Sequence, residues 1–256
     1  MIAITNKGHW QLDGIDAILF DKDGTLIDSH VYWGEVIKRR ARKIIYCLGL
    51  KNRMYEMLCN VMGFSLEESR LRPEGPIALV GRDEVISIMC RFLESCGRPT
   101  SFEYISRVFL EVHAAFLPEI NDYIHLIPGT ISFLDALRDV GTKAAVVTSD
   151  SVANTIEALK RLGIESYFNL VVGKESVPEP KVTGVPALRA MKELGVAPAG
   201  TVCLGDAPVD MIMADKSGCK AGVGIASGQS SENVLANYTP YVSSSLSELR
   251  ILELTS

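Results

Sequence analysis

Two acidic side chains, Asp21 and Asp23, directly follow the apolar run DAILF in the segment DKDG. A second acidic pair, Asp206 and Asp210, stands in the segment GDAPVD after the apolar run TVCL. Ionised carboxylates are costly to desolvate, and turn formation by Asp and Gly does not explain two such clusters. Carboxylate oxygens are the ligands that Mg²⁺ prefers, whereas Zn²⁺ sites usually include His or Cys. The two segments therefore predict a magnesium site if the fold brings them together.

Short apolar runs alternate with amphipathic helical patterns through most of the chain. Strands are predicted at 16–20, 143–147, 168–172, 201–204 and 220–225, and helices at 129–140, 151–162, 184–194 and 208–217. This alternation predicts an α/β protein with a Rossmann-like parallel sheet covered on both faces. Ligands of such sheets bind beyond the carboxyl ends of the strands, near a topological switch point. The segments DKDG, TSD and GDAPVD all follow predicted strands, so we expect them to meet at one edge of the sheet.

The segment between the first predicted strand and residue 127 differs from the rest because it has no clear strand pattern. Amphipathic helices are predicted there at 31–47, 52–61, 83–96 and 101–116, with a break at 70–81. We interpret this segment as an inserted α-helical cap domain at 30–126. The core domain then consists of 1–29 and 127–256.

Composition excludes several classes of protein. The net charge of -5 over 256 residues argues against a general nucleic-acid binder. No apolar run approaches the roughly 20 residues that span a bilayer, and the first ten residues lack a secretory signal. The 6 cysteines form no CxxC pair and the 4 histidines are scattered, which argues against a zinc site or a serine triad. These features favour a cytoplasmic protein without a membrane or nucleic-acid partner.

Four motifs in order resemble those of the haloacid dehalogenase superfamily, and within it the capped phosphatases similar to phosphoglycolate phosphatase and β-phosphoglucomutase. The motifs are DKDGT at 21–25, Thr148 after VV, Lys181, and GDAPVD at 205–210. The third departs from the family pattern Lys-Pro-x-Pro, since the sequence reads PEPKVTG. The resemblance covers the predicted core and implies a Mg²⁺-dependent phosphatase for a small phosphorylated metabolite.

The resemblance also implies roles for the motif residues. Asp21 is the expected nucleophile, which would form an aspartyl-phosphate. Asp23 is the expected general acid and base. Thr148, Ser149 and Lys181 are expected to bind the phosphoryl oxygens.

The implied Mg²⁺ ligands are Asp21, the backbone carbonyl of Asp23, and Asp206. Asp210 either holds a water molecule of the metal or orients Lys181. The bound cation would compensate the clustered carboxylates.

Several residues have structural alternatives. Thr148 could cap the helix that begins near residue 151, although Ser149 and Asp150 are better cap candidates. Lys174 could replace Lys181 as the functional lysine, and Gly24 could serve only a turn.

The roles of two cationic side chains also stay open. Lys22 occupies a position that is usually apolar in the family, and we expect its long side chain to reach solvent. Arg82 could contact a second anionic group of the substrate, or it could form a surface ion pair.

Other activities are possible on the same fold. Asp23 argues against a dehalogenase, which lacks the second aspartate of the first motif. No spacing singles out a cap lysine for a phosphonate-cleaving enzyme. A β-type sugar phosphomutase and a non-catalytic binding protein stay as alternatives, and neither the substrate nor the oligomeric state follows from the motifs.

Overall fold

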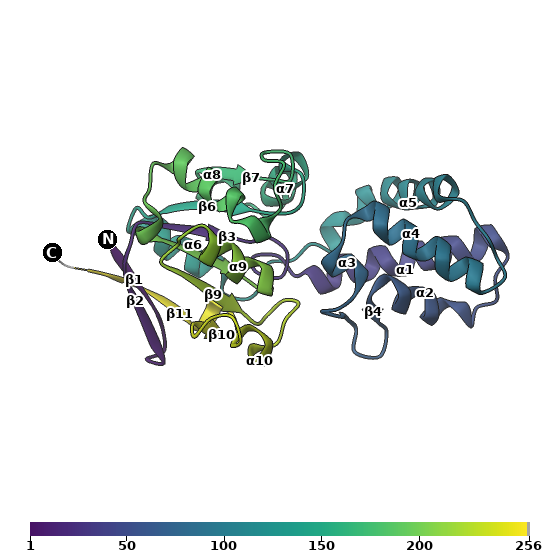
Figure 1. Ribbon diagram of the computed structural model, residues 1–256, viewed down its shortest axis with the longest axis horizontal. Coiled ribbons are helices and arrows are strands. Elements are labelled where there is room, and N and C mark those ends of the chain that lie inside the picture. Colours follow the sequence, from purple (N-terminus) through teal and green to yellow (C-terminus); the bar gives the residue numbers. More distant parts are fainter. Residues whose placement is uncertain (255–256) are drawn as a thin grey trace. The chain divides into compact units, whose positions relative to one another are not determined.

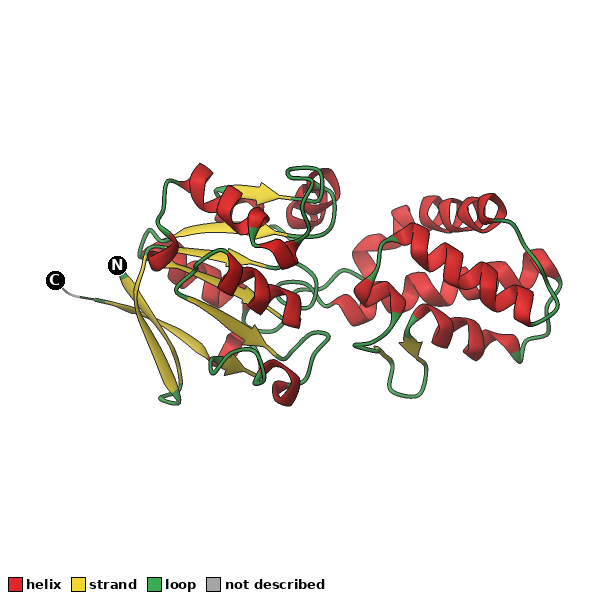
Figure 2. Ribbon diagram, in the orientation of Figure 1, coloured by secondary structure: helices red, strands yellow, loops and turns green. Residues whose placement is uncertain are grey.

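The computed structural model of the protein describes residues 1–254, the side chains of residues 78 and 79 excepted. The chain forms two compact units (Figure 1). The core unit comprises Met1–Asp28 and the chain from Leu126 onward, and the helical unit comprises Ser29–His125. The core unit mixes helices and strands, whereas the helical unit is almost entirely helical (Figure 2).

The core unit is built on a six-stranded parallel sheet in the order β10-β9-β8-β3-β6-β7. Its strands are β3 (Ala17–Phe20), β6 (Lys143–Val147), β7 (Leu170–Val172), β8 (Thr201–Gly205), β9 (Ala221–Ile225) and β10 (Val242–Ser243). The predicted α/β class is confirmed. The chain starts this sheet at β3 and winds outward first through β6 and β7, and then through β8, β9 and β10. The switch point of the doubly wound sheet therefore lies between β3 and β8.

Helices pack on the sheet because its strands are apolar on both sides, as parallel strands usually are. The helices are α6 (Thr130–Asp139), α7 (Val152–Arg161), α8 (Val185–Leu194) and α9 (Pro208–Lys216). In β3, Ala17 and Leu19 share a buried cluster with side chains of α8 and α9. Phe20 faces the other way and makes an edge-to-face contact with Phe133 of α6. Alternation along one strand thus joins both helical layers to the sheet.

A second sheet of the core unit was not predicted. It is antiparallel, in the order β11-β1-β2, with β1 at Ile2–Asn6, β2 at Trp10–Ile15 and β11 at Leu249–Glu253. Its pairing joins residues 2–6 to residues 249–253, a separation that local sequence patterns do not reveal. The short strand β10 and the short helix α10 (Glu232–Leu235) were also missed.

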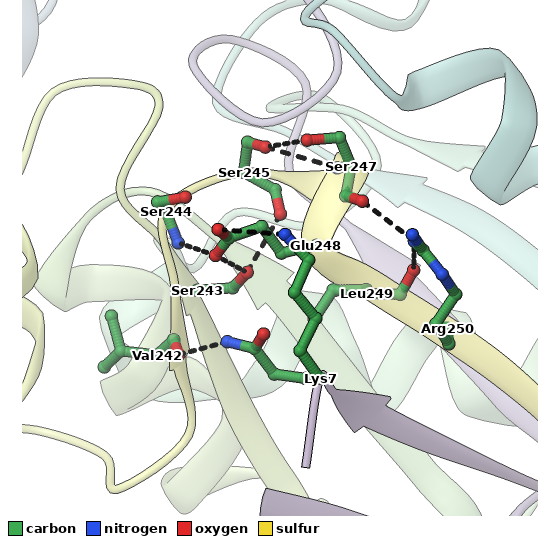
Figure 3. Close-up of polar contacts among 10 residues, drawn as sticks. Lys7, Val242, Ser243, Ser244, Ser245, Ser247, Glu248, Leu249 and Arg250 are labelled. Atoms are coloured by element: carbon green, nitrogen blue, oxygen red, sulfur yellow. Dashed lines mark hydrogen bonds and ion pairs between the residues drawn. The ribbon is translucent and has the colours of Figure 1, made fainter. Parts of the chain in front are cut away.

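The serine-rich segment between β10 and β11 is held by side-chain contacts (Figure 3). Oε2 of Glu248 accepts hydrogen bonds from the backbone of Ser244 at 3.3 Å and from the hydroxyl of Ser243 at 3.4 Å. Its other oxygen lies 3.5 Å from Nζ of Lys7, which follows β1. These contacts link the serine-rich segment to the antiparallel sheet.

The helical unit consists of α1 (Ser29–Leu48), α2 (Met54–Met62), α3 (Pro76–Leu79), α4 (Arg82–Ser95) and α5 (Phe102–Phe116). Buried side chains of α1 recur at Ile37, Ala41 and Ile44, the spacing of one helix face. The predicted break holds α3 and part of a two-stranded hairpin, β4 (Phe64–Ser65) and β5 (Arg70–Leu71). Across residues 1–254, every helix is too short or too polar to cross a membrane.

Candidate active site

Three acidic residues meet where β3 and β8 end. The backbone N–H of Asp21 donates to the carbonyl of Leu204 at 2.8 Å, which ties the two strand ends together. Asp21, Asp206 and Asp210 are all buried, and one carboxylate oxygen of each lies within 4.8 Å of the other two. The two segments that the sequence analysis placed at one sheet edge are thus side by side at the switch point.

Lys181 lies inside this acidic cluster. Its Nζ is 2.5 Å from Oδ1 of Asp21 and 2.8 Å from Oδ1 of Asp210, and its side chain is 6% exposed. Burial lowers the pKa of Lys181, but the two aspartates outweigh burial and raise it above its ordinary value. Lys174 is exposed on the surface. The structure therefore brings Lys181, and not Lys174, to the carboxylates.

The electrostatics of the cluster favour a further cation. Burial, followed by the charges of Asp21 and Asp210, raises the pKa of Asp206 well above its ordinary value. Burial also raises the pKa of Asp21, although Lys181 opposes this effect. One ammonium group faces three buried carboxylates, so a divalent cation would remove the excess negative charge.

Asp206 is held in a narrow space between two glycines. A Cβ atom on Gly24 would lie 2.0 Å from Oδ2 of Asp206, and a Cβ on Gly228 would lie 2.1 Å from it. The φ angle of Gly24 is +85°, which a side chain would also strain. Gly24 therefore serves both the turn and the close approach. The loop after β9 that contains Gly228 was predicted only as a strand end.

The backbone leaves one oxygen of Asp206 available. Its Oδ2 accepts from the backbone N–H of Gln229 at 2.6 Å. No hydrogen bond to its Oδ1 is found from any described residue. Three close carboxylates, one with an unengaged oxygen, fit the oxygen-rich ligand set of Mg²⁺.

Asp210 is engaged on both oxygens. Its Oδ1 contacts Lys181, and its Oδ2 accepts from the backbone N–H of Ala207 at 3.2 Å, at the start of α9. Of the two roles considered for Asp210, the orientation of Lys181 is the one that agrees with this contact.

Thr148 lies at the end of β6 and is 6% exposed. Its hydroxyl oxygen accepts from the backbone N–H of Asp150 at 3.1 Å. The cap of α7 is Ser151, whose hydroxyl accepts from the N–H of Asn154 at 3.2 Å. The alternative that Thr148 caps this helix, and the preference for Ser149 or Asp150 as its cap, are therefore not borne out, because the helix begins one residue later than predicted. Ser149 is exposed.

Lys22 does not reach solvent, contrary to our expectation. Its side chain is 7% exposed, and its Nζ lies 2.9 Å from Oδ2 of Asp150 and 3.1 Å from Oδ2 of Asp23. Burial raises the pKa of Asp23, and Lys22 acts in the opposite direction. The carboxylate of Asp23 thus faces Lys22 and lies outside the cluster of Asp21 and its neighbours.

The sequence analysis placed the TSD segment at this edge of the sheet, but it did not predict that Asp150 pairs with Lys22. The contact arises because β6 pairs with β3, so the residues that follow the two strands are neighbours.

Arg82 is the first residue of α4 in the helical unit. Its Nη2 lies 3.5 Å from the carbonyl oxygen of Ser106 in α5. No ion pair of Arg82 occurs within residues 1–254, so the surface ion pair considered from the sequence is not seen.

Three features together define the class of this protein. It has a doubly wound parallel sheet, an acidic site with a lysine at the switch point of that sheet, and a helical insertion after the first strand of that sheet. A family model described as haloacid dehalogenase-like hydrolase matches residues 15–218. The chain belongs to this family of hydrolases, and the resemblance noted from the motifs is confirmed.

Individual relatives agree with this assignment. A phosphoglycolate phosphatase of Neisseria meningitidis is 26% identical over 226 residues, which cover 88% of this chain and 86% of the relative.

Solved structures share the fold. One, described as a predicted phosphoglycolate phosphatase from Haemophilus somnus, has a TM-score of 0.71 and 21% identity, and covers 93% of this chain and 97% of its own. A β-phosphoglucomutase from Clostridium difficile has a TM-score of 0.62 and 19% identity, with 91% and 92% covered.

Proposed function

We propose that this protein is a Mg²⁺-dependent phosphatase that hydrolyses a small phosphorylated metabolite through an aspartyl-phosphate. The observation that carries the proposal is the position of Lys181, which bridges Asp21 and Asp210 beside Asp206. A carboxylate nucleophile needs nearby positive charge to approach a phosphate dianion. The lysine supplies part of that charge next to Asp21.

The first half of the reaction transfers the phosphoryl group to the protein. Lys181 contacts Oδ1 of Asp21, so Oδ2 is the oxygen that attacks phosphorus. The bond between phosphorus and the leaving oxygen breaks, and Asp23 donates its proton to that oxygen. The raised pKa of Asp23 favours the protonated form that this step requires. Thr148 and Ser149 would donate hydrogen bonds to the phosphoryl oxygens.

The second half hydrolyses the aspartyl-phosphate. Asp23, now a carboxylate, accepts a proton from a water molecule that attacks phosphorus. The bond to Asp21 breaks, inorganic phosphate leaves, and the starting enzyme is restored.

Mg²⁺ would be held by Asp21, Asp206 and the backbone carbonyl of Asp23. When bound, it supplies positive charge that shields the nucleophile from the phosphate. Asp210 would act on the metal only indirectly, because both of its oxygens already have protein partners.

The substrate is proposed from the relatives. Because phosphoglycolate phosphatases are among these relatives, we propose a phosphomonoester that carries a second anionic group as the substrate. Arg82 is the contact proposed from the sequence for that group, because a guanidinium pairs with a carboxylate. Arg82→Gln should then raise the KM for phosphoglycolate and leave the KM for a phosphomonoester without a second charge unchanged.

Phosphate release from a panel of phosphorylated metabolites, with and without a chelator, tests the proposal. We expect Mg²⁺-dependent release from phosphoglycolate or a sugar phosphate. Conversion of β-glucose 1-phosphate to its isomer, without net release, would instead assign a phosphomutase. Binding without any turnover across the panel would contradict the phosphatase.

A further inference from the structure

A buried ammonium group lies between two carboxylates beside the proposed nucleophile. Nζ of Lys22 is 2.9 Å from Asp150 and 3.1 Å from Asp23, with 7% of the side chain exposed. A buried charge is costly unless it is well paired, and here two aspartates pair it. The mechanism above uses Asp23, but it gives no role to Lys22 or Asp150.

Asp150 is fixed by the helix that follows it. Its Oδ1 accepts from the backbone N–H of Ser151 at 2.7 Å and from Nδ2 of Asn154 at 3.2 Å. Its Oδ2 accepts from Lys22 at 2.9 Å. Because both oxygens are engaged, the carboxylate of Asp150 has a defined orientation at the N-terminus of α7, where negative charge is stabilised.

The backbone of Lys22 is fixed as well. Its carbonyl oxygen accepts from the N–H groups of Leu26 and Ile27, each at 3.0 Å. Lys22 is therefore held at both ends, by this turn and by Asp150. A connected set of contacts leads from α7 through Asp150 and Lys22 to the carboxylate of Asp23.

Asp23 depends on this set of contacts. Its side chain is 30% exposed, and Lys22 is the one cation paired with it within residues 1–254. A carboxyl group that transfers a proton must point at the leaving oxygen, and small misplacements of reacting groups are costly. Without Lys22, the side chain of Asp23 would be free to rotate toward solvent.

We propose that Lys22, anchored by Asp150, is a positioning residue that fixes the Asp23 carboxyl group for proton transfer to and from the leaving group. The inference rests on the proposed function only in the role it gives Asp23. It also differs from a direct contact between Lys22 and the phosphoryl group, which would affect all substrates equally.

Lys22→Met tests the inference, because it keeps an unbranched side chain of nearly the same length and removes the charge. On an alkyl phosphate, kcat should fall by about ten- to a hundredfold with little change in KM. On p-nitrophenyl phosphate, whose leaving group needs no proton, kcat should change by less than about twofold. Lys22→Arg should restore most of the lost activity, and Asp150→Asn should reproduce the selective loss in a weaker form.

Lys143→Met is the matched control. Lys143 is exposed and donates to the carbonyl of Leu194 at 2.6 Å, and it lies at the start of β6, at the opposite end of the strand from the carboxylates. This variant should show no selective loss of activity on the alkyl phosphate relative to p-nitrophenyl phosphate. Thermal unfolding of each variant shows whether the protein is folded. If Lys22→Met does not fold, Asp150→Asn provides the test in its place.

The double variant Lys22→Met, Asp23→Asn separates the inference from the proposed function. Once the acid is absent, removing Lys22 should cost less than about a further twofold on either substrate. Equal losses on both substrates, a full additional loss in the double variant, or unchanged kcat in Lys22→Met would each overturn the inference. The proposed function is tested separately, by the turnover of the wild-type protein and of the single variant Asp23→Asn.

Discussion

The ammonium group of Lys181 lies 2.5 Å from Oδ1 of Asp21, and the pair is buried beyond the end of β3. The same ammonium contacts Asp210, so the lysine has a defined place between two carboxylates. In this arrangement, Lys181 contacts Oδ1 of Asp21 and not its second oxygen.

Lys181→Met should lower turnover strongly, whereas Lys174→Met should leave it unchanged. The first variant removes the charge beside Asp21, whereas Lys174 is exposed and forms no ion pair with a described residue. Removing a positioned charge of this kind typically costs about 10²–10³ in kcat. Steady-state phosphate release measures both variants, and the reverse ranking of the two lysines would show that the functional lysine is misassigned.

Mg²⁺ should stabilise the protein in a pH-dependent way. Burial raises the pKa of Asp206, so the folded metal-free protein binds a proton more tightly than the unfolded chain. Its stability therefore falls as pH rises above the ordinary pKa of Asp toward the raised one. The metal needs an ionised carboxylate, so its stabilising effect should grow over the same interval.

Thermal unfolding with and without Mg²⁺ checks this expectation. At a concentration of about 100 times Kd, Tm should rise by roughly 5–10 °C near neutral pH, and by little in acid. Asp206→Asn should lose most of the shift and most of the activity. A shift that is equal at all pH values, or equal in Asp206→Asn, would argue against this metal site.

Asp23→Asn should lose activity unevenly between substrates. It removes the proton donor but retains Asp21, so turnover of an alkyl phosphate should drop by about 10²–10⁴-fold. An aryl phosphate, with a better leaving group, should lose much less. Provided that chemistry limits the rate, equal proportional losses on both substrates would show that Asp23 is not the acid.

Arg40→Met should raise the stability of the helical unit. The guanidinium of Arg40 lies 4.0 Å from the ring centroid of Phe109, but its Nε is buried without a hydrogen-bond partner. Burial, and then the charge of Arg82, lower the pKa of Arg40 to about 10. Methionine keeps the apolar contact and removes an uncompensated charge, which should add about 1 kcal/mol or more to the free energy of unfolding.

Arg42→Met serves as the control for that measurement. Arg42 lies on the same helix, but its side chain is 60% exposed, and the pair with Glu35 is long, at 3.9 Å. Its replacement should change stability by less than about 0.5 kcal/mol. A lower Tm for Arg40→Met than for Arg42→Met would mean that the guanidinium of Arg40 stabilises the fold.

The meeting of Asp21 and Asp206 could be predicted from the sequence because parallel strands share one carboxyl edge. Each residue follows an apolar strand, and the strand pattern indicates which edge they occupy. The same reasoning placed the DKDG and TSD segments at this edge, but it did not pair Lys22 with Asp150. That contact depends on the pairing of β3 with β6, which makes the residues that follow the two strands neighbours.

The antiparallel sheet shows the same limit at the level of the fold. Ile4 pairs with Ile251, although nearly the whole chain separates them. Periodicity reports local structure and carries no information about such partners. Gly228 was overlooked for a related reason, because a loop glycine shows its packing against Asp206 only in three dimensions.

The most direct test of the central claim is to trap the covalent intermediate. Enzyme mixed with substrate and Mg²⁺ would be quenched in acid within one turnover, reduced with borohydride, and digested for mass spectrometry. An aspartyl-phosphate is converted by this treatment to homoserine, and we predict homoserine at position 21 only, and none in Asp21→Asn. Homoserine at another aspartate, or its absence while phosphate is released in a burst, would contradict Asp21 as the nucleophile.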